Sequence, residues 1–107
     1  MMTVYDTEVS RKMVSRRIED LINQFYKILP LREGGSKTLS QYIESLLREM
    51  LGMQDLMVEW HDDGQYMSLL GILRFLATNP ECDVSVVKSD VFKAISIIKR
   101  LHRKYTD

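Results

Sequence analysis

One histidine and three carboxylic acids lie close together in the segment that contains Glu59, His61, Asp62 and Asp63. Imidazole and carboxylate groups are metal ligands and general acids or bases, so this segment is the first candidate for chemistry. Only Glu59 and Asp63 have the four-residue spacing that places two side chains on one helical face, and we expect the helix to end between them. Asp62 or Asp63 also suits the N-cap of a following helix. The spacing therefore favours a turn with a helix cap over a metal or catalytic site.

The remaining reactive groups are isolated from one another. Cys82 is the only cysteine, so an internal disulfide and a multi-cysteine metal site are excluded. It lies between two acids, a poor setting for a nucleophilic thiolate, and His102 lies among basic residues, a poor setting for a cation ligand. Residues 34–37, GGSK, lack the preceding strand and the full spacing of a phosphate-binding loop. We therefore expect a protein that is not an enzyme and that uses no metal or cofactor.

Length and composition indicate one small domain over residues 1–107, with a short tail at residues 1–6. Of the 107 residues, 45% are hydrophobic and 28% are charged, which suits a globular protein with one core. Fifteen basic and fifteen acidic residues cancel, so no overall charge attracts nucleic acid or an anionic membrane. No apolar run reaches the roughly 20 residues of a membrane span, and the first residues do not resemble a signal peptide. We expect a cytoplasmic protein.

Apolar residues recur every three or four positions in four segments of the chain. This spacing places them on one helical face and predicts helices near residues 8–29, 38–60, 65–78 and 84–105. The second segment has the longest apolar series, and short connections separate it from its neighbours. Helices that each bury one face and follow one another closely pack as a bundle. We therefore predict an all-α fold, an antiparallel four-helix bundle.

Several residues predict where these helices begin, end or approach one another. Pro30 is expected to end the first helix, because proline disfavours the helical conformation in the residue before it. Thr38 and Gln41 have the spacing of a capping box and predict the start of the second helix. Gly52 inside that helix indicates either a close approach by a neighbouring helix or a bend. Asp83 is the expected N-cap of the last helix.

Charge is unevenly distributed along the chain. Residues 33–63 contain seven acids and two bases, whereas residues 64–107 contain four acids and seven bases. Six basic side chains on the first and last predicted helices are candidates for contact with a partner: Arg11, Lys12, Arg16, Lys93, Arg100 and Lys104. A basic face is most often only solvated, and the functional alternatives are a nucleic-acid backbone or an acidic protein. Net neutrality and the lack of exposed aromatic residues among the bases count against nucleic acid.

Met53, Met57 and Trp60 lie on the apolar seam of the second predicted helix. Methionine fills irregular gaps and also suits adaptable surfaces, so these side chains belong either to the core or to a contact with another protein. Because this helix is apolar on more than one face, we expect part of it to stay exposed and to form the interface of a two-fold homodimer. Its acid-rich end would then face the basic last helix of the other copy.

Two resemblances extend this interpretation. Residues 34–47, GGSKTLSQYIESLL, resemble the turn and second helix of ribbon-helix-helix DNA-binding proteins, which implies a DNA-associated regulatory role. The size and helix order are similar to those of small bacteriocin-immunity proteins of Gram-positive bacteria, which implies such a function by fold analogy alone. Our leading hypothesis from the residues themselves is a small bacterial helical bundle, not an enzyme, that binds another protein or itself.

Overall fold

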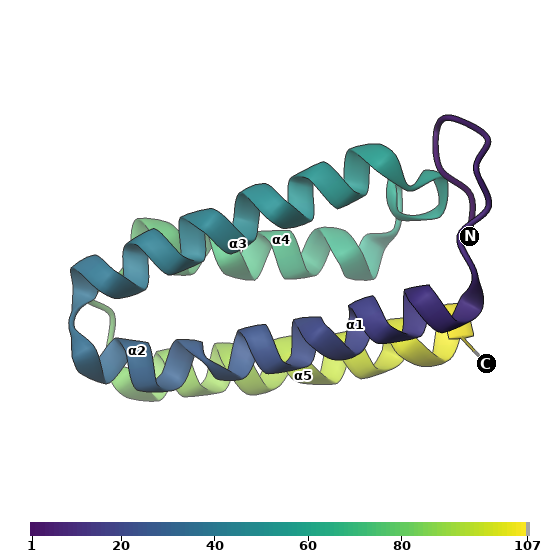
Figure 1. Ribbon diagram of the computed structural model, residues 1–107. Coiled ribbons are helices and arrows are strands. Elements are labelled where there is room, and N and C mark those ends of the chain that lie inside the picture. Colours follow the sequence, from purple (N-terminus) through teal and green to yellow (C-terminus); the bar gives the residue numbers. More distant parts are fainter. Residues whose placement is uncertain (107) are drawn as a thin grey trace.

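The computed structural model describes residues 1–106, which form a bundle of helices (Figure 1). Four long helices make up the bundle, and the first of them is followed after a short break by an additional helix of two turns. The elements are α1 Arg11–Tyr26, α2 Ile28–Gly34, α3 Ser36–Leu56, the 3-10 turn η1 Val58–Trp60, α4 Gly64–Thr78 and α5 Val84–Thr106. The predicted all-α bundle is confirmed, whereas its antiparallel order stays a prediction.

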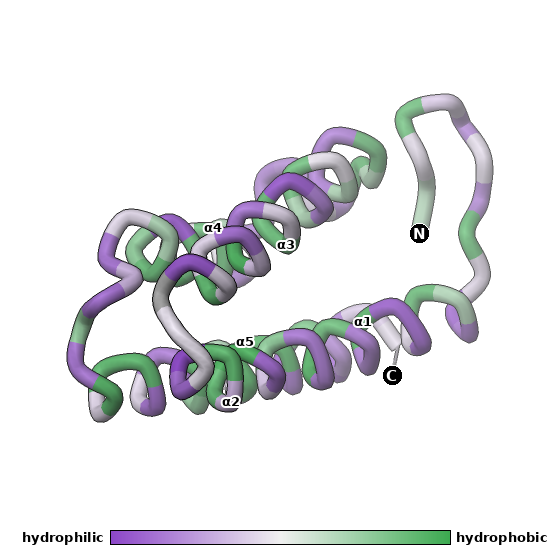
Figure 2. The backbone as a smooth tube through the Cα atoms, turned by 60° about the vertical axis from the view of Figure 1, so that its left-hand side comes forward, coloured by the Kyte–Doolittle hydropathy of each residue, from purple (hydrophilic) through white to green (hydrophobic). Residues whose placement is uncertain are grey.

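The helices are arranged in two layers. α1 and α5 lie side by side in one layer, and α3 and α4 form the other, while α2 extends the layer of α1 (Figure 1). Figure 2 shows hydrophobic and hydrophilic residues alternating along the helices, as expected when each helix buries one face. The molecule measures 41 × 23 × 20 Å, and the long helices run along its longest dimension (Figure 1). The core therefore lies between the two layers along the whole bundle.

The predicted apolar seams supply this core. The buried side chains include Val14, Ile18, Leu21 and Phe25 of α1, Leu39, Ile43, Leu46 and Met50 of α3, Leu69, Leu70, Leu73 and Leu76 of α4, and Val87, Val91, Ala94, Ile98 and Leu101 of α5. Burial of one such large aliphatic side chain contributes about 1.5–3 kcal/mol to folding. Val84, the first residue of α5, does not belong to this core, because it is 45% exposed at the start of the helix.

The first predicted helix begins later and ends differently from the prediction. Ser10 is its N-cap, and the Ser10 hydroxyl accepts a hydrogen bond from the backbone N–H of Met13. The α-helical hydrogen-bond pattern is interrupted at Lys27, whose φ of −64° and ψ of −17° stay helical, and Pro30 lies in the first turn of α2. The prediction that Pro30 ends a helix is wrong because the first turn of a helix does not need the N–H group that proline lacks.

α3 begins at Ser36, so the predicted capping box of Thr38 and Gln41 lies inside the helix. The chain enters α3 through Gly35, whose φ of 122° is a conformation that residues with a Cβ rarely adopt. Gly52 is exposed, and a Cβ built on it would meet no atom within 4 Å apart from its immediate helical surroundings. No neighbouring helix approaches Gly52 closely, so the first of the two explanations for this glycine is wrong.

The end of α3 is set by the first residues of the chain. The backbone of Met57 is extended and forms a bridge with Thr3, and the Val4 N–H donates to the Leu56 carbonyl at 2.8 Å. The Val58 N–H in turn donates to the carbonyl of Met2 at 2.9 Å. These hydrogen bonds replace the helical bonds that α3 would otherwise continue, so the helix stops at Leu56 and not at residue 60 as predicted.

The last two long helices match the prediction most closely. α4 and α5 begin and end within one residue of the predicted bounds. The Asp83 carboxylate accepts a hydrogen bond from the Ser85 N–H at 3.1 Å, which confirms the predicted cap of α5.

Candidate interaction surfaces

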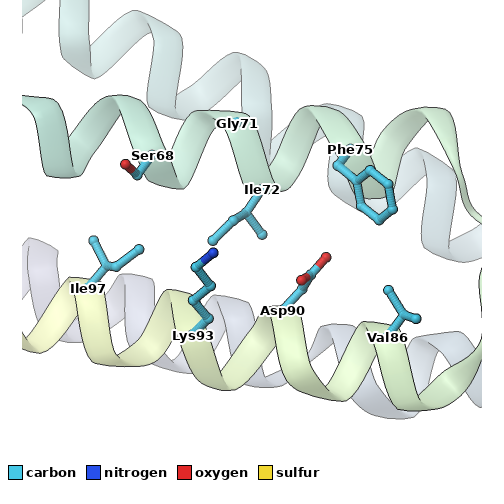
Figure 3. A pocket seen from close by; sticks show the side chains of 8 residues that line it. All are labelled: Ser68, Gly71, Ile72, Phe75, Val86, Asp90, Lys93 and Ile97. Carbon is cyan, nitrogen blue, oxygen red and sulfur yellow. The ribbon is translucent and has the colours of Figure 1, made fainter.

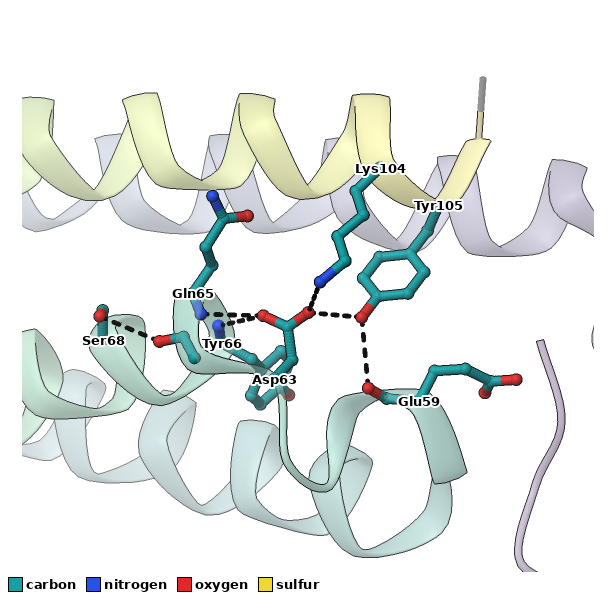
Figure 4. Close-up of polar contacts among 8 residues, drawn as sticks. Glu59, Asp63, Gln65, Tyr66, Ser68, Lys104 and Tyr105 are labelled. Carbon is teal, nitrogen blue, oxygen red and sulfur yellow. Dashed lines mark hydrogen bonds and ion pairs between the residues drawn. The ribbon is translucent and has the colours of Figure 1, made fainter.

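The acidic turn between α3 and α4 is a helix cap (Figure 4). Asp63 is buried, and its Oδ1 accepts hydrogen bonds from the backbone N–H groups of Gln65 and Tyr66 at 2.9 and 3.0 Å. Its Oδ2 accepts from Lys104 Nζ at 2.7 Å and from the Tyr105 hydroxyl at 2.5 Å, both in the last turns of α5. We call the contacts of Asp63 with Lys104 and Tyr105 the Asp63 latch. The predicted cap is confirmed, and it also ties α4 to α5.

The Asp63 latch fixes the protonation states of its members. Burial alone would raise the pKa of the Asp63 carboxyl, but hydrogen bonds from Lys104, Tyr105 and the Tyr66 N–H outweigh it, and the pKa lies below its ordinary value. Burial, followed by the bond to this carboxylate, raises the pKa of Tyr105. A general base works best with a pKa near the operating pH, so neither group suits proton transfer at neutral pH.

The other members of the acidic turn point elsewhere. His61 and Asp62 are exposed, and the Glu59 carboxylate accepts the Met2 N–H at 3.1 Å, away from Asp63. The four side chains that the sequence places next to one another therefore do not converge on one point. The turn acts as a junction between the tail, α4 and α5.

A hydroxyl, an imidazole and a carboxylate do meet between α1 and α5. Ser15 Oγ lies 2.8 Å from His102 Nε2, and Glu19 Oε1 lies 3.6 Å from the same nitrogen. In a catalytic triad the carboxylate holds the other ring nitrogen, which here lies 3.3 Å from the Thr106 hydroxyl. The group therefore lacks the orientation of a nucleophile relay and connects the two helices. Sequence reasoning missed it because Ser15 and His102 are 87 positions apart.

The predicted basic candidates separate into different surroundings. Arg11, Lys12 and Arg16 are exposed on α1, and no ion pair joins them to any residue within 1–106. Their neighbour Arg17, in contrast, pairs with Glu49 of α3 at 2.6 Å.

On α5 the three basic candidates have three different surroundings. Lys104 belongs to the Asp63 latch, and the exposed Arg100 donates to its own helix at the Ser96 carbonyl, 3.4 Å away. Lys93 is exposed beside a groove.

The methionine and tryptophan candidates lie mostly inside the protein. Met57 and Trp60 are 3% and 1% exposed, and Met53 is half-buried. The Trp60 ring stacks on Tyr66 with centroids 5.1 Å apart and meets the edge of Tyr105 at 6.4 Å. Of the two alternatives for these side chains, burial favours the core for Met57 and Trp60, because η1 turns the indole back into the bundle.

A groove runs between α4 and α5, and we call it the α4–α5 groove (Figure 3). It encloses about 450 Å³ and is lined by Ser68, Gly71, Ile72 and Phe75 of α4 and by Val86, Asp90, Lys93 and Ile97 of α5. Figure 3 shows the α4 and α5 side chains pointing toward one another across it. Phe75 and Val86 are 44% and 37% exposed, so large apolar groups face solvent there. The signal in the sequence was a second apolar stripe, Ile72 and Phe75, beside the main seam of α4.

An exposed aromatic pair lies between α1 and α5. Tyr26 and Phe92 are 41% and 50% exposed, and their ring centroids are 6.4 Å apart in an edge-on arrangement. Lys88 and Lys99 are exposed on α5, one and two turns from Phe92. The sequence-based expectation that no exposed aromatic residue accompanies the bases is therefore wrong.

Comparisons with protein-family models, with curated proteins and with solved structures gave no match to this chain. Within residues 1–106, no helix combines the length and the apolar character that crossing a membrane requires.

Proposed function

We propose that this protein is a cytoplasmic bacterial interaction module, without catalytic activity, that acts by binding another protein through the α4–α5 groove. The observation that supports this most is the apolar lining of the groove, in which Phe75 and Val86 are exposed beside the half-buried Ile72 and the buried Ile97. Exposed large apolar side chains that gather in one place mark contact surfaces more often than isolated ones do.

A second copy of the chain is the first partner to consider. Asp90 and Lys93 stand on the same wall of the groove, and neither forms an ion pair with another residue in the described part of the chain. In a two-fold dimer the same surface of both copies forms the interface, so every contact occurs two times. Asp90 of each copy would then form an ion pair with Lys93 of the other copy. Ser68 and Gly71 have small side chains, which lets a facing helix approach closely. The groove is therefore complementary to itself in charge.

The size of this face predicts a weak dimer. α4 has 15 residues, which gives a face about 22 Å long, and two neighbouring helices are about 20 Å wide. Such a face offers about 400–450 Å² per copy, against the roughly 800 Å² per partner of a standard stable interface. We therefore expect dissociation in the micromolar range or above.

Sedimentation equilibrium between micromolar and millimolar concentration tests the proposal. We expect Asp90→Lys to raise the dimer dissociation constant about tenfold, because it places four cations across the two-fold axis. Asp90→Lys combined with Lys93→Asp should restore the affinity, since the pairs are then only reversed. Phe75→Glu should abolish the dimer, and Phe92→Glu, an equally exposed position outside the groove, should leave it intact. A 12.5 kDa species at every concentration would refute the dimer.

Nucleic-acid binding is the second candidate function. The observation that favours it is the aromatic pair of Tyr26 and Phe92 between Lys88 and Lys99, because bases stack on aromatic rings while lysines contact phosphates. The balanced net charge argues against it. Retention on single- and double-stranded DNA at increasing salt decides the matter, because phosphate contacts release counterions and weaken steeply with salt. Retention that is lost in the Phe92→Ala variant would favour this candidate over the first.

A further inference from the structure

The two layers of the bundle carry opposite charge. The helices α1 and α5, which lie side by side, contain ten basic and three acidic residues, whereas residues 36–78, which contain the other layer, have three basic and six acidic residues. Two of the ten bases, Arg17 and Lys104, pair with acids of the other layer, and eight remain. A polyanion responds to the charge of the face that it contacts, so net neutrality does not exclude it here.

Four exposed residues of α5 follow one line along this basic layer, and we call them the α5 stripe: Lys88, Phe92, Lys99 and Arg103. Spacings of four, seven and four residues keep them on one side of the helix. The stripe is about 22 Å long, which gives room for about six nucleotides at the roughly 3.4 Å spacing of a stacked strand and for fewer when the strand is extended. None of its three cations forms an ion pair within residues 1–106, so their charges are free to contact a ligand.

The ring of Phe92 lies between these cations and is 50% exposed. Its edge-on contact with Tyr26 of α1, with centroids 6.4 Å apart, restricts the ring before any ligand binds and so lowers the entropic cost of stacking. A base can stack on a side chain only when its own face is free. That is the case in a single strand, whereas the bases of a duplex are already stacked on one another. The position of Phe92 therefore favours single-stranded over double-stranded nucleic acid.

A hollow of about 380 Å³ opens between α1 and α5 at the other end of the stripe. It is lined by Glu19 and Ile22 of α1 and by Lys99, His102 and Arg103 of α5. The Glu19 carboxylate lies 3.6 Å from His102 Nε2, so its charge faces an imidazole that can also carry a proton. The hollow thus combines an apolar wall with two cations, a combination that suits a base together with its neighbouring phosphates.

From these contacts we propose that the α5 stripe binds a short segment of single-stranded nucleic acid. One base stacks on Phe92, a second base lies in the hollow against Ile22, and Lys88, Lys99 and Arg103 contact phosphates. Every base has a face that can stack, so we expect little sequence preference. Such binding rests on the second candidate function and does not involve the α4–α5 groove, which a different set of residues lines.

Fluorescence anisotropy with three labelled probes tests the proposal: an oligothymidylate of about eight nucleotides, a hairpin duplex with as many base pairs, and poly-glutamate, a polyanion without bases. At low salt we expect the single strand to bind at least about tenfold more tightly than the other two, because it alone can stack on Phe92. Three phosphate contacts predict that the logarithm of its affinity falls with the logarithm of the salt concentration at a slope of about −2.

The outcomes separate the proposal from the function on which it rests. If neither nucleic acid binds, both the proposal and the second candidate function are wrong. A duplex that binds as tightly as the single strand would overturn the proposal and leave nucleic-acid binding standing. Poly-glutamate that binds as tightly as the single strand would also overturn it, and would assign the basic layer to an acidic protein.

Two pairs of matched variants locate the binding. Phe92→Ala should weaken single-strand binding about tenfold or more without changing the salt slope, whereas Phe75→Ala, at an exposed position on α4, should change neither. Lys99→Gln should make the slope shallower by about 0.7, and Arg48→Gln, an exposed base of α3 in the other layer, should leave it unchanged. Equal effects of the two phenylalanine variants, or an unchanged slope in Lys99→Gln, would overturn the proposal. All four side chains are exposed, so helix content by circular dichroism should stay constant.

Discussion

Removal of the Asp63 carboxylate tests the role of the Asp63 latch. The side chain accepts four hydrogen bonds, two from the first turn of α4 and two from the last turns of α5. Loss of an N-cap costs about 1 kcal/mol. Loss of the bonds from Lys104 and Tyr105 adds about 1–2 kcal/mol, a value reduced because Lys104 is half-exposed and because Tyr105 keeps an alternative acceptor in the Glu59 carbonyl. We therefore expect Asp63→Ala to lower the free energy of unfolding by about 2–3 kcal/mol.

Asp63→Asn separates the two parts of this effect. Asparagine is also a good N-cap, so it preserves the bonds to the Gln65 and Tyr66 N–H groups but loses the charge that faces Lys104. We expect it to recover about 1 kcal/mol of the loss. Urea unfolding followed by Trp60 fluorescence measures all three proteins, because the Trp60 indole contacts Tyr105 and reports on the same end of the bundle.

The pH dependence of these differences is the stricter test. Since the folded pKa of Asp63 lies below its ordinary value of 3.8, ionisation of this carboxyl stabilises the fold. That stabilisation is fully present above the ordinary pKa and is lost as the pH falls through the lower, folded pKa. The difference between the wild type and Asp63→Asn should therefore be constant from pH 5 to 7 and shrink below pH 4. A loss under about 0.5 kcal/mol in Asp63→Ala, or a difference that grows on acidification, would refute the reasoning.

Three further outcomes are expected from other parts of the fold. Leu46→Ala and Ile98→Ala should each lower the free energy of unfolding by about 2–5 kcal/mol in urea titrations, because both side chains are buried between the layers; losses well under 1 kcal/mol at both would contradict the packing. Gly52→Ala should raise the thermal midpoint and add up to about 1 kcal/mol to the free energy of unfolding, because the alanine Cβ would have no clashing atom within 4 Å. Gly35→Ala, the matched control, should lower the midpoint because of its positive φ. The far-ultraviolet circular-dichroism spectrum should be dominated by helix, and a substantial β-sheet signal would contradict the fold.

The sequence predicted the features of the fold that depend on neighbours within one or two turns. The seam that includes Leu46 is visible because a side chain returns to the same face every three or four residues, whatever it packs against. The caps Asp63 and Asp83 are visible for the same reason, since each bonds to N–H groups two or three positions ahead. Local spacing is sufficient for such features.

Features that depend on distant residues were missed. Met57 continues the seam of α3 in sequence, but its backbone pairs with Thr3, and no local pattern reveals that competition. The same applies to the meeting of Ser15 with His102, and to Trp60, whose burial follows from the turn at η1. Pro30 was misjudged for a different reason: its effect depends on its position within a helix, and the interruption at Lys27 places it in the first turn of α2, which begins at Ile28.

The pairing of α1 with α5 has a consequence for how the protein forms during synthesis. α1 is made well before α5, the helix that covers much of its apolar face. Until α5 is made, the apolar face of α1 is without the helix that buries much of it. Asp63 likewise lacks its hydrogen bonds from Lys104 and Tyr105. Contacts between segments far apart in the sequence are slow to form, and exposed apolar surface in the interval favours aggregation. Nascent chains stalled before α5 should therefore require chaperones, and rapid completion of that helix should protect the newly made protein.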